Sequence, residues 1–154
     1  MAATTSAGPT AGKAGKEGAE RSDALVLFGA TGDLAHKKIF PAVYQLEAAG
    51  RLEGPIIGVA SSEGDDEFLR GRARASLDDV VGDVDAEVAD RLLAKVHYVS
   101  GDYREQQVYA DLAKVLEGCT HPLFYLAIPP TLFDDVITGL HDCGVTDDSR
   151  VVVE

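Results

Sequence analysis

Five short apolar runs alternate with longer amphipathic stretches along this chain. The runs are 24–28, 56–60, 96–100, 122–127 and 150–154, and each is rich in valine, isoleucine, leucine or aromatic residues. Their apolar residues are continuous rather than placed at every second position, which is typical of strands covered on both faces. The pattern therefore predicts five buried β-strands.

The stretches between these runs have the spacing of amphipathic helices. Helices are expected at 65–79, 86–96, 104–118 and 129–144, and the last two of them end at glycine. Strand–helix–strand units that repeat in this way join into a parallel sheet through right-handed crossovers. The predicted fold class is a single α/β domain with a doubly wound parallel sheet of about five strands.

The first run ends in a glycine turn that leads directly into a helix. In VLFGATGDLA (26–35), Gly29 ends the strand where a tight turn is needed, and Gly32 lacks the Cβ that would keep a pyrophosphate from the backbone. Ala35 is small enough for the helix to pack close to the strand. The N–H groups of residues 30–34 would then face a phosphate at the positive end of the helix.

A glycine pair in a turn is by itself only a turn. Here it follows the first strand, precedes a helix and is followed by a second strand about 20 residues downstream. This context favours a dinucleotide-binding site.

Pro41 interrupts the helix that follows the turn. Because proline cannot continue the hydrogen-bond ladder, the sequence predicts a short helix (DLAHKKI, 33–39), a break, and a second helix beginning near Pro41. Lys37 and Lys38 lie on the short piece. Lysine is common at solvated helix ends, and Lys37 is interpreted in this way.

Composition excludes several classes of partner. The 14 basic and 26 acidic residues give a net charge of −12, which argues against a nucleic-acid or anionic membrane surface. No run of about 18 apolar residues is present in the sequence, so no membrane span is predicted. Cys119 and Cys143 lack metal-ligand spacing and are interpreted as buried or partly buried thiols in a reducing compartment. The acidic stretch 78–90 is interpreted as a solvated connection between helices rather than a metal site.

Residues 1–23 differ in composition from the rest of the chain. They consist mainly of alanine, glycine, threonine and serine, without the apolar core of a secretory signal, and their basic residues are balanced by acids. Such a segment cannot offset the entropy lost on ordering. We therefore expect a disordered tail over 1–23 and one domain over 24–154.

Three motifs resemble those of glucose-6-phosphate dehydrogenases. GATGDLAHKKIFP (29–41) resembles the family's G-A-S-G-D-L-A-x-K-K-x-x-P motif, and FYLAIPPTLFDDV (124–136) is similar to its F-Y-L-A-x-P-P stretch. VVVE (151–154) resembles the start of its V-E-K-P-F-G motif. The three motifs follow the family's order over residues 24–154.

The resemblance implies a Rossmann domain that binds NADP, or NAD, for the oxidation of glucose 6-phosphate at C1 to the lactone. The residues implied to line the cofactor phosphates are Gly29, Ala30, Thr31, Gly32, Asp33 and Leu34. Those implied to border the nicotinamide are Ala127, Ile128 and Pro129. Lys38 matches a family lysine that lies near both the cofactor and the sugar phosphate. The whole enzyme would be a cytoplasmic homo-oligomer of the pentose phosphate pathway, without nucleic-acid or membrane partners.

Two substitutions, one after the second strand and one in the second motif, depart from the family. Ser61 stands where the family commonly has an arginine for the 2′-phosphate of NADP; it offers a hydroxyl but no charge. Glu63, two residues on, favours a ribose hydroxyl, as in NAD sites. Three arginines of the next helix are candidates to supply the missing charge: Arg70, Arg72 and Arg74. Phe133 replaces a frequent tyrosine of the cofactor site.

The third departure is that the sequence ends at Glu154, before the position of the family's histidine base. None of its four histidines matches that base, so no catalytic residue is assigned. The expectation is an amino-terminal fragment that is inactive on its own.

Two alternatives stand beside the dehydrogenase fragment. One is a stand-alone nucleotide-binding or sensing module without catalysis. The other is a short-chain-type reductase, which requires a Tyr-x-x-x-Lys pair after the fourth strand. The sequence contains no such pair.

Overall fold

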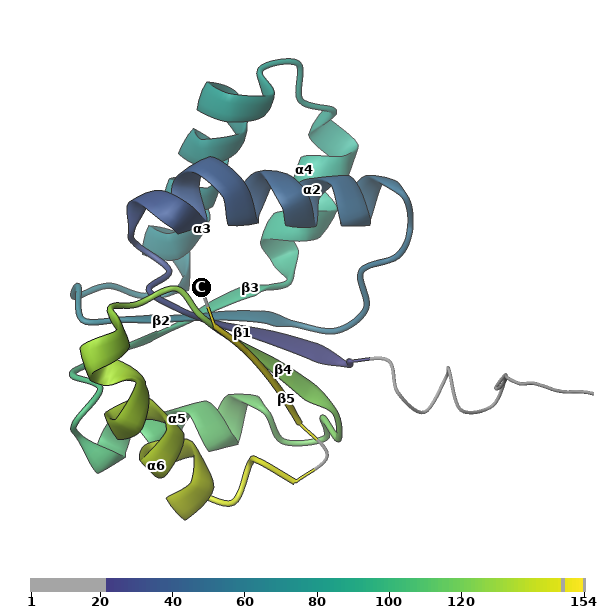
Figure 1. Cartoon of the computed structure of the whole chain (residues 1–154). Helices are drawn as coiled ribbons and strands as arrows, with labels where there is room; N and C mark the ends of the chain where they lie inside the picture. Colours follow the sequence, from purple (N-terminus) through teal and green to yellow (C-terminus); the bar gives the residue numbers. More distant parts are fainter. Residues whose placement is uncertain (1–21, 148, 154) are drawn as a thin grey trace, which may run out of the picture.

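A five-stranded parallel sheet runs through the centre of the computed structural model, which describes residues 22–147 and 149–153 (Figure 1). The strands are β1 (Ala24–Phe28), β2 (Ile56–Ala60), β3 (Val96–Ser100), β4 (Pro122–Leu126) and β5 (Arg150–Val153). They pair in the order β3-β2-β1-β4-β5, and every pair is parallel. The five predicted strands and their parallel arrangement are confirmed.

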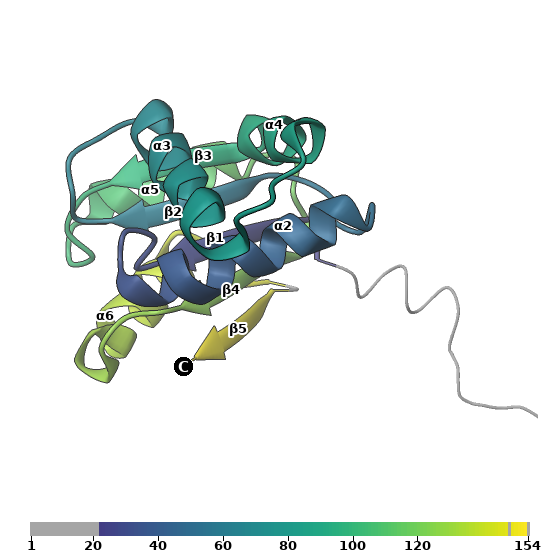
Figure 2. The ribbon, with the colours of Figure 1, turned by 90° about the horizontal axis from the view of Figure 1, so that it is seen from above.

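Helices cover both faces of this sheet (Figures 1 and 2). One face carries α2 (Phe40–Ala48), α3 (Asp66–Ser76) and α4 (Ala86–Ala94), and the other carries α5 (Gln106–Val115) and α6 (Phe133–Asp142). Short helical segments precede α2, follow α3 and precede α6: η1 (Ala35–Ile39), η2 (Leu77–Val81) and η3 (Pro130–Leu132). The predicted doubly wound α/β fold is confirmed.

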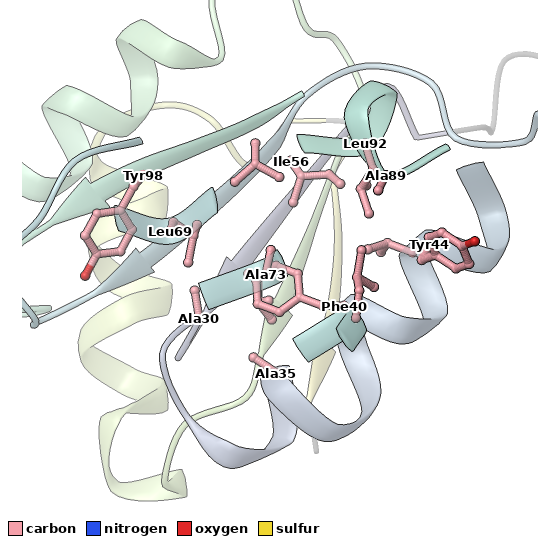
Figure 3. Close-up of a cluster of buried hydrophobic side chains, with 14 of the residues drawn as sticks. Ala30, Ala35, Phe40, Tyr44, Ile56, Leu69, Ala73, Ala89, Leu92 and Tyr98 are labelled. Carbon is pink, nitrogen blue, oxygen red and sulfur yellow. The ribbon is translucent and has the colours of Figure 1, made fainter. Parts of the chain in front are cut away.

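The core consists of two clusters, one on each face of the sheet. In β1, Leu27 points into the cluster beneath α2, α3 and α4, which is drawn in Figure 3. Its neighbours Val26 and Phe28 point into the cluster beneath α5 and α6. All three side chains are fully buried. Because both faces of the strand are covered, its apolar residues are continuous rather than alternating.

The predicted helix break at Pro41 is wrong. The backbone of Ile39 and Phe40 stays helical, with φ values of −78° and −62°. The N–H of Phe40 donates to the carbonyl of Ala35, five residues back, which is the hydrogen bond of a π turn. This wider turn places Pro41 in the first turn of α2, where a missing N–H does little harm. The chain therefore passes from the glycine turn into α2 without leaving the helical conformation.

The helix predicted to begin at residue 86 is confirmed, and the helical segment predicted to end at residue 79 extends to Val81. Residues 77–81 form the π turn η2 directly after α3, and α4 begins at Ala86. Gly82, at φ 82°, ends η2. The connection between the two helices is therefore confined to residues 82–85.

β5 is an exception to the expectation that every strand is covered on both faces. Its side chains are all exposed, with Val151 at 45%, Val152 at 37% and Val153 at 52%. β5 lies at the edge of the sheet and pairs with β4. Among the described residues, no second strand pairs with its outer edge. The valine run correctly indicated a strand, but not its burial.

Residues 1–21 of the predicted tail lie outside the described residues. Its last residue, Asp23, is held against the loop before β4. The Asp23 carboxylate accepts hydrogen bonds from the N–H groups of Thr120 (2.6 Å) and His121 (2.8 Å). Burial acts to raise the pKa of Asp23, but these hydrogen bonds outweigh it and lower that pKa.

The two cysteines are free thiols, as expected, and both are partly buried. Burial raises the pKa of Cys119 and of Cys143, so both are less reactive than an exposed thiol. In the described part of the chain, no helix is both long enough and apolar enough to cross a membrane.

Candidate functional site

The carboxyl ends of β1 and β4 meet at the point where the strand order changes direction. Within the sheet, β2 is the neighbour of β1 on one side and β4 is its neighbour on the other side. The N–H of Ala127, just after β4, donates to the carbonyl of Phe28 at the end of β1 (3.0 Å). Doubly wound sheets bind ligands in the crevice at such a switch point. The predicted phosphate turn (29–34) and nicotinamide segment (127–129) are thus adjacent.

Gly29 makes this adjacency possible. Its φ is +87°, and an added Cβ would overlap the carbonyl oxygen of Ala127 and lie 3.0 Å from its carbonyl carbon. A side chain would also lie 3.2 Å from Cγ2 of Ile128. Glycine is therefore required both for the backbone conformation and for the close approach of the two loops.

Ala30 contributes to packing rather than to a surface that a ligand would touch. Its side chain is 1% exposed and lies in the core cluster beneath α2, α3 and α4 (Figure 3). A Cβ added to Gly58 in β2 would lie 2.7 Å from the Cβ of Ala30, which is too close. The Ala30 side chain therefore packs here because residue 58 is glycine. The N–H of Ala30 donates to Val59 at 3.4 Å.

Two of the five amides predicted to be free are therefore used within the fold. Besides Ala30, Gly32 donates its N–H to the carbonyl of Gly29 (3.0 Å), which closes the turn. The prediction treated the turn as open backbone, whereas a tight turn satisfies part of its own hydrogen-bonding capacity.

The helix after Gly32 begins with unpaired donors. The carbonyl of Gly32 accepts the first helical hydrogen bond, from the N–H of His36 (3.2 Å). Asp33, Leu34 and Ala35 therefore form the first turn, and their N–H groups have no partner within the helix. Ala35 is fully buried, so the donors that a ligand can reach are those of Asp33 and Leu34. Gly32 is exposed, and an added Cβ would have only the carbonyl oxygen of Gly29 as a near neighbour, at 3.4 Å. These donors, together with the helix dipole, can bind an anionic group that approaches over Gly32.

Tyr103 supports the phosphate turn, and the sequence analysis did not identify it. Its hydroxyl accepts a hydrogen bond from the N–H of Gly29 (3.0 Å) and donates one to the carbonyl of Val59 (3.2 Å). Its ring packs edge-on against Phe28, with centroids 5.7 Å apart. Burial raises the pKa of Tyr103 to about 12, so the hydroxyl keeps the proton that it donates. A tyrosine three residues after a strand, at the carboxyl edge of the sheet, was the available signal.

One arginine of α3 reaches the phosphate turn. Arg70 donates to the carbonyl of Val96 (3.1 Å), and Arg74 pairs with Asp90 (3.3 Å). Arg72 donates instead to the carbonyl of Thr31 (2.7 Å). The sequence did not distinguish these three arginines as candidates for binding the 2′-phosphate. In the structure, Arg72 is the one that contacts the phosphate turn.

The loop after β2 lies beside this arginine's helix. Ser61 and Glu63 are both exposed. Between them, the carbonyl of Ser62 accepts hydrogen bonds from the hydroxyls of Tyr98 (2.6 Å) and Ser100 (2.8 Å). The backbone of the loop is thus fixed by β3, and its side chains remain available.

The other predicted site residues fall into two groups. Ile128 and Phe133 are partly buried and pack on the cluster beneath α5 and α6, while Pro129 is exposed just before η3. Lys38 is exposed on the π turn η1. Single π turns are frequent at functional sites. This one carries Lys38, which matches the family lysine near the cofactor and the sugar phosphate.

Two histidines pair with carboxylates, an arrangement that the sequence analysis did not predict. Nε2 of His36 on η1 lies 3.0 Å from Asp79 on η2, and Nδ1 of His97 on β3 lies 3.1 Å from Asp66 on α3. Both pairs join elements of the α2–α3–α4 side of the molecule. Among the described residues, no hydrogen bond or ion pair joins either pair to the segment 127–129 that is predicted to border the nicotinamide.

Comparison with known proteins identifies close similarity over nearly all of the described chain. Residues 26–154 match the family model described as glucose-6-phosphate dehydrogenase, NAD binding domain. Glucose-6-phosphate 1-dehydrogenase 1 of Mycobacterium bovis is 39% identical over 137 residues, which cover 89% of this chain and 29% of that protein. The chain thus spans less than a third of the length of the curated relatives that it matches.

Two solved structures show the same relationship. The crystal structure of glucose-6-phosphate 1-dehydrogenase from Mycobacterium avium is 41% identical, with a TM-score of 0.81, over 86% of this chain and 29% of that one. A glucose-6-phosphate dehydrogenase in complex with its substrate glucose 6-phosphate is 33% identical, with a TM-score of 0.73, over 86% and 30% of the two chains.

Proposed function

Because this chain belongs to the glucose-6-phosphate dehydrogenase family, we propose that it forms the NADP-binding part of an enzyme that oxidises glucose 6-phosphate at C1 to the lactone. The enzyme would act in the pentose phosphate pathway as a cytoplasmic homo-oligomer. The two free cysteines suit a reducing compartment.

One observation carries the proposal: unpaired N–H groups begin a helix beside an exposed glycine, at the switch point of the sheet. The chain has a net charge of −12, so its overall field repels an anionic cofactor. Local donors must therefore bind the phosphates. The first turn of the helix offers the N–H groups of Asp33, which is exposed, and Leu34, which is partly exposed, together with the positive end of the helix dipole, and these fit a pyrophosphate.

The residues of this chain would seat and orient the cofactor. Bound NADP would accept the hydride from C1 of the sugar. The backbone of the phosphate turn would fix the pyrophosphate, and Ala127, Ile128 and Pro129 would hold the nicotinamide against the end of β4. Lys38, exposed on η1, would contact the sugar phosphate.

We expect the 154-residue chain to bind both NADP and NAD, with weak discrimination between them. Ser61 and Arg72 favour the 2′-phosphate of NADP, whereas Glu63 favours the free ribose hydroxyl of NAD. Isothermal titration calorimetry with each nucleotide measures both affinities, and inorganic phosphate alone serves as a control for nonspecific anion binding. The absence of heat with either nucleotide would refute the proposed function.

We expect no oxidation of glucose 6-phosphate by this chain on its own. General-base assistance contributes roughly 10²–10⁴ in rate, and substrate positioning contributes more. Within the described residues, no hydrogen bond or ion pair joins either histidine–carboxylate pair to the predicted nicotinamide segment. The measurement is NADPH formation followed by absorbance at saturating nucleotide. If turnover were found and His36→Ala abolished it, the His36–Asp79 pair would be the overlooked base.

A further inference from the structure

We propose that Arg72 supplies the positive charge that binds the 2′-phosphate of NADP in this chain. This inference rests on the proposed function, because it concerns the cofactor site of that function. It assigns the role to a residue of α3 rather than to the position directly after β2, where this chain has the uncharged Ser61.

The requirement for such a charge follows from the loop after β2. In sheets of this kind the loop contacts the adenosine ribose, and discrimination between the two cofactors depends on whether a cation or a carboxylate faces the ribose. Here the side chains of the loop provide a hydroxyl, from Ser61, and a carboxylate, from Glu63, both exposed. An NADP phosphate placed here would meet negative charge unless a cation comes from another element.

Arg72 is positioned to be that cation. Its guanidinium donates to the carbonyl of Thr31 in the phosphate turn (2.7 Å), so the side chain extends from α3 to the end of β1. Its Cζ also lies 5.8 Å from the centroid of the Phe68 ring, a cation–π contact that restrains it. The guanidinium is thus held beside the pyrophosphate turn.

A second contact places the same charge near that loop. The ring of Phe68 packs against Tyr98, with centroids 5.5 Å apart, and the Tyr98 hydroxyl donates to Ser62. Burial raises the pKa of Tyr98, and the charge of Arg72 acts against this rise. The Phe68 and Tyr98 rings therefore connect the Arg72 guanidinium to the backbone of the loop.

The guanidinium of Arg72 also has N–H donors that are not used within the described part of the protein. It carries five N–H groups, and the hydrogen bond to Thr31 uses one of them. Among residues 22–147 and 149–153, no ion pair joins Arg72 to a carboxylate, in contrast to Arg74. Arg72 is exposed to solvent. A planar fork with free donors is the group that best matches a phosphate.

The test compares NADP and NAD binding by four variants of the 154-residue chain, using calorimetry. Arg72→Gln should weaken NADP binding about tenfold or more, since charge-assisted hydrogen bonds are lost, while NAD affinity stays within about twofold. Arg72→Lys should retain part of the NADP affinity because it keeps the charge without the fork. Arg74→Gln, the matched control two residues further on, should change neither affinity. Ser61→Arg combined with Arg72→Gln should restore NADP binding.

Three outcomes would overturn the inference. An equal loss of NADP and NAD affinity in Arg72→Gln would mean that Arg72 acts only by holding Thr31. Unchanged NADP affinity would place the 2′-phosphate elsewhere. If the parent chain bound neither nucleotide, the proposed function itself would fail, and this inference with it.

Discussion

Replacing Gly29 by alanine is expected to lower the free energy of unfolding by about 3–5 kcal/mol, the upper range for a single substitution. A non-glycine residue at its φ of +87° costs about 1–2 kcal/mol. The added Cβ would also overlap the Ala127 carbonyl, which would force β1 and β4 apart at their carboxyl ends. Such a loss is a large share of the stability of a typical domain. Urea denaturation followed by circular dichroism measures it.

Gly50 provides the matched control for this experiment. It has a similar positive φ, +70°, at the end of α2, but an added Cβ there has no neighbour within 4 Å. Gly50→Ala should therefore cost only about 1 kcal/mol, the strain of the backbone conformation. Equal losses in the two variants would show that the contact between Gly29 and Ala127 contributes nothing to stability.

Gly32→Val is expected to abolish dinucleotide binding and leave the fold intact. Gly32 does not have a positive φ, and an added Cβ would meet only the carbonyl of Gly29, at 3.4 Å. The protein therefore has room for the side chain, but the branched methyl groups would occupy the approach to the first helical turn. Loss of two or three hydrogen bonds to phosphate should weaken binding at least about a hundredfold. Calorimetry measures the affinity, and thermal unfolding measures the stability.

Gly71→Val is the corresponding control, because Gly71 in α3 also lacks a positive φ and has no near neighbour for a Cβ. It should preserve nucleotide binding. If Gly32→Val bound NADP as tightly as the parent chain, the pyrophosphate would have to bind at another turn.

The strands were predictable because their signal is local. Each of the five runs is apolar along its own length, and burial on both faces produces that pattern without reference to the rest of the chain. β5 shows the limit of this reasoning, because its valines favour a strand whether or not helices cover it. Pro41 shows another limit. Its effect on the helix depends on whether the preceding turn can widen, and composition does not determine that.

The candidate site was predictable where it is contiguous. Residues 29–34 follow one another, so their glycine spacing, together with the strand before them and the helix after them, predicts a phosphate turn. Tyr103 contacts Gly29 across 74 positions of sequence, and Arg72 contacts Thr31 across 41. Both contacts exist only because the sheet places separate βα connections at one edge. Sequence patterns could name the arginines of α3 as candidates, but only the packed helix distinguishes Arg72 from Arg70 and Arg74.

The hydrogen bond between Tyr103 and the phosphate turn has a spectroscopic consequence. The chain contains five tyrosines and no tryptophan, so selective isotope labelling of tyrosine would give a small set of ring signals in an NMR spectrum. The Tyr103 hydroxyl bonds the N–H of Gly29, and any ligand that moves this backbone alters the electron density of the ring. The ring signals of Tyr103 therefore report on ligand binding at the phosphate turn, and binding can be followed without a dye, a fusion or a mutation.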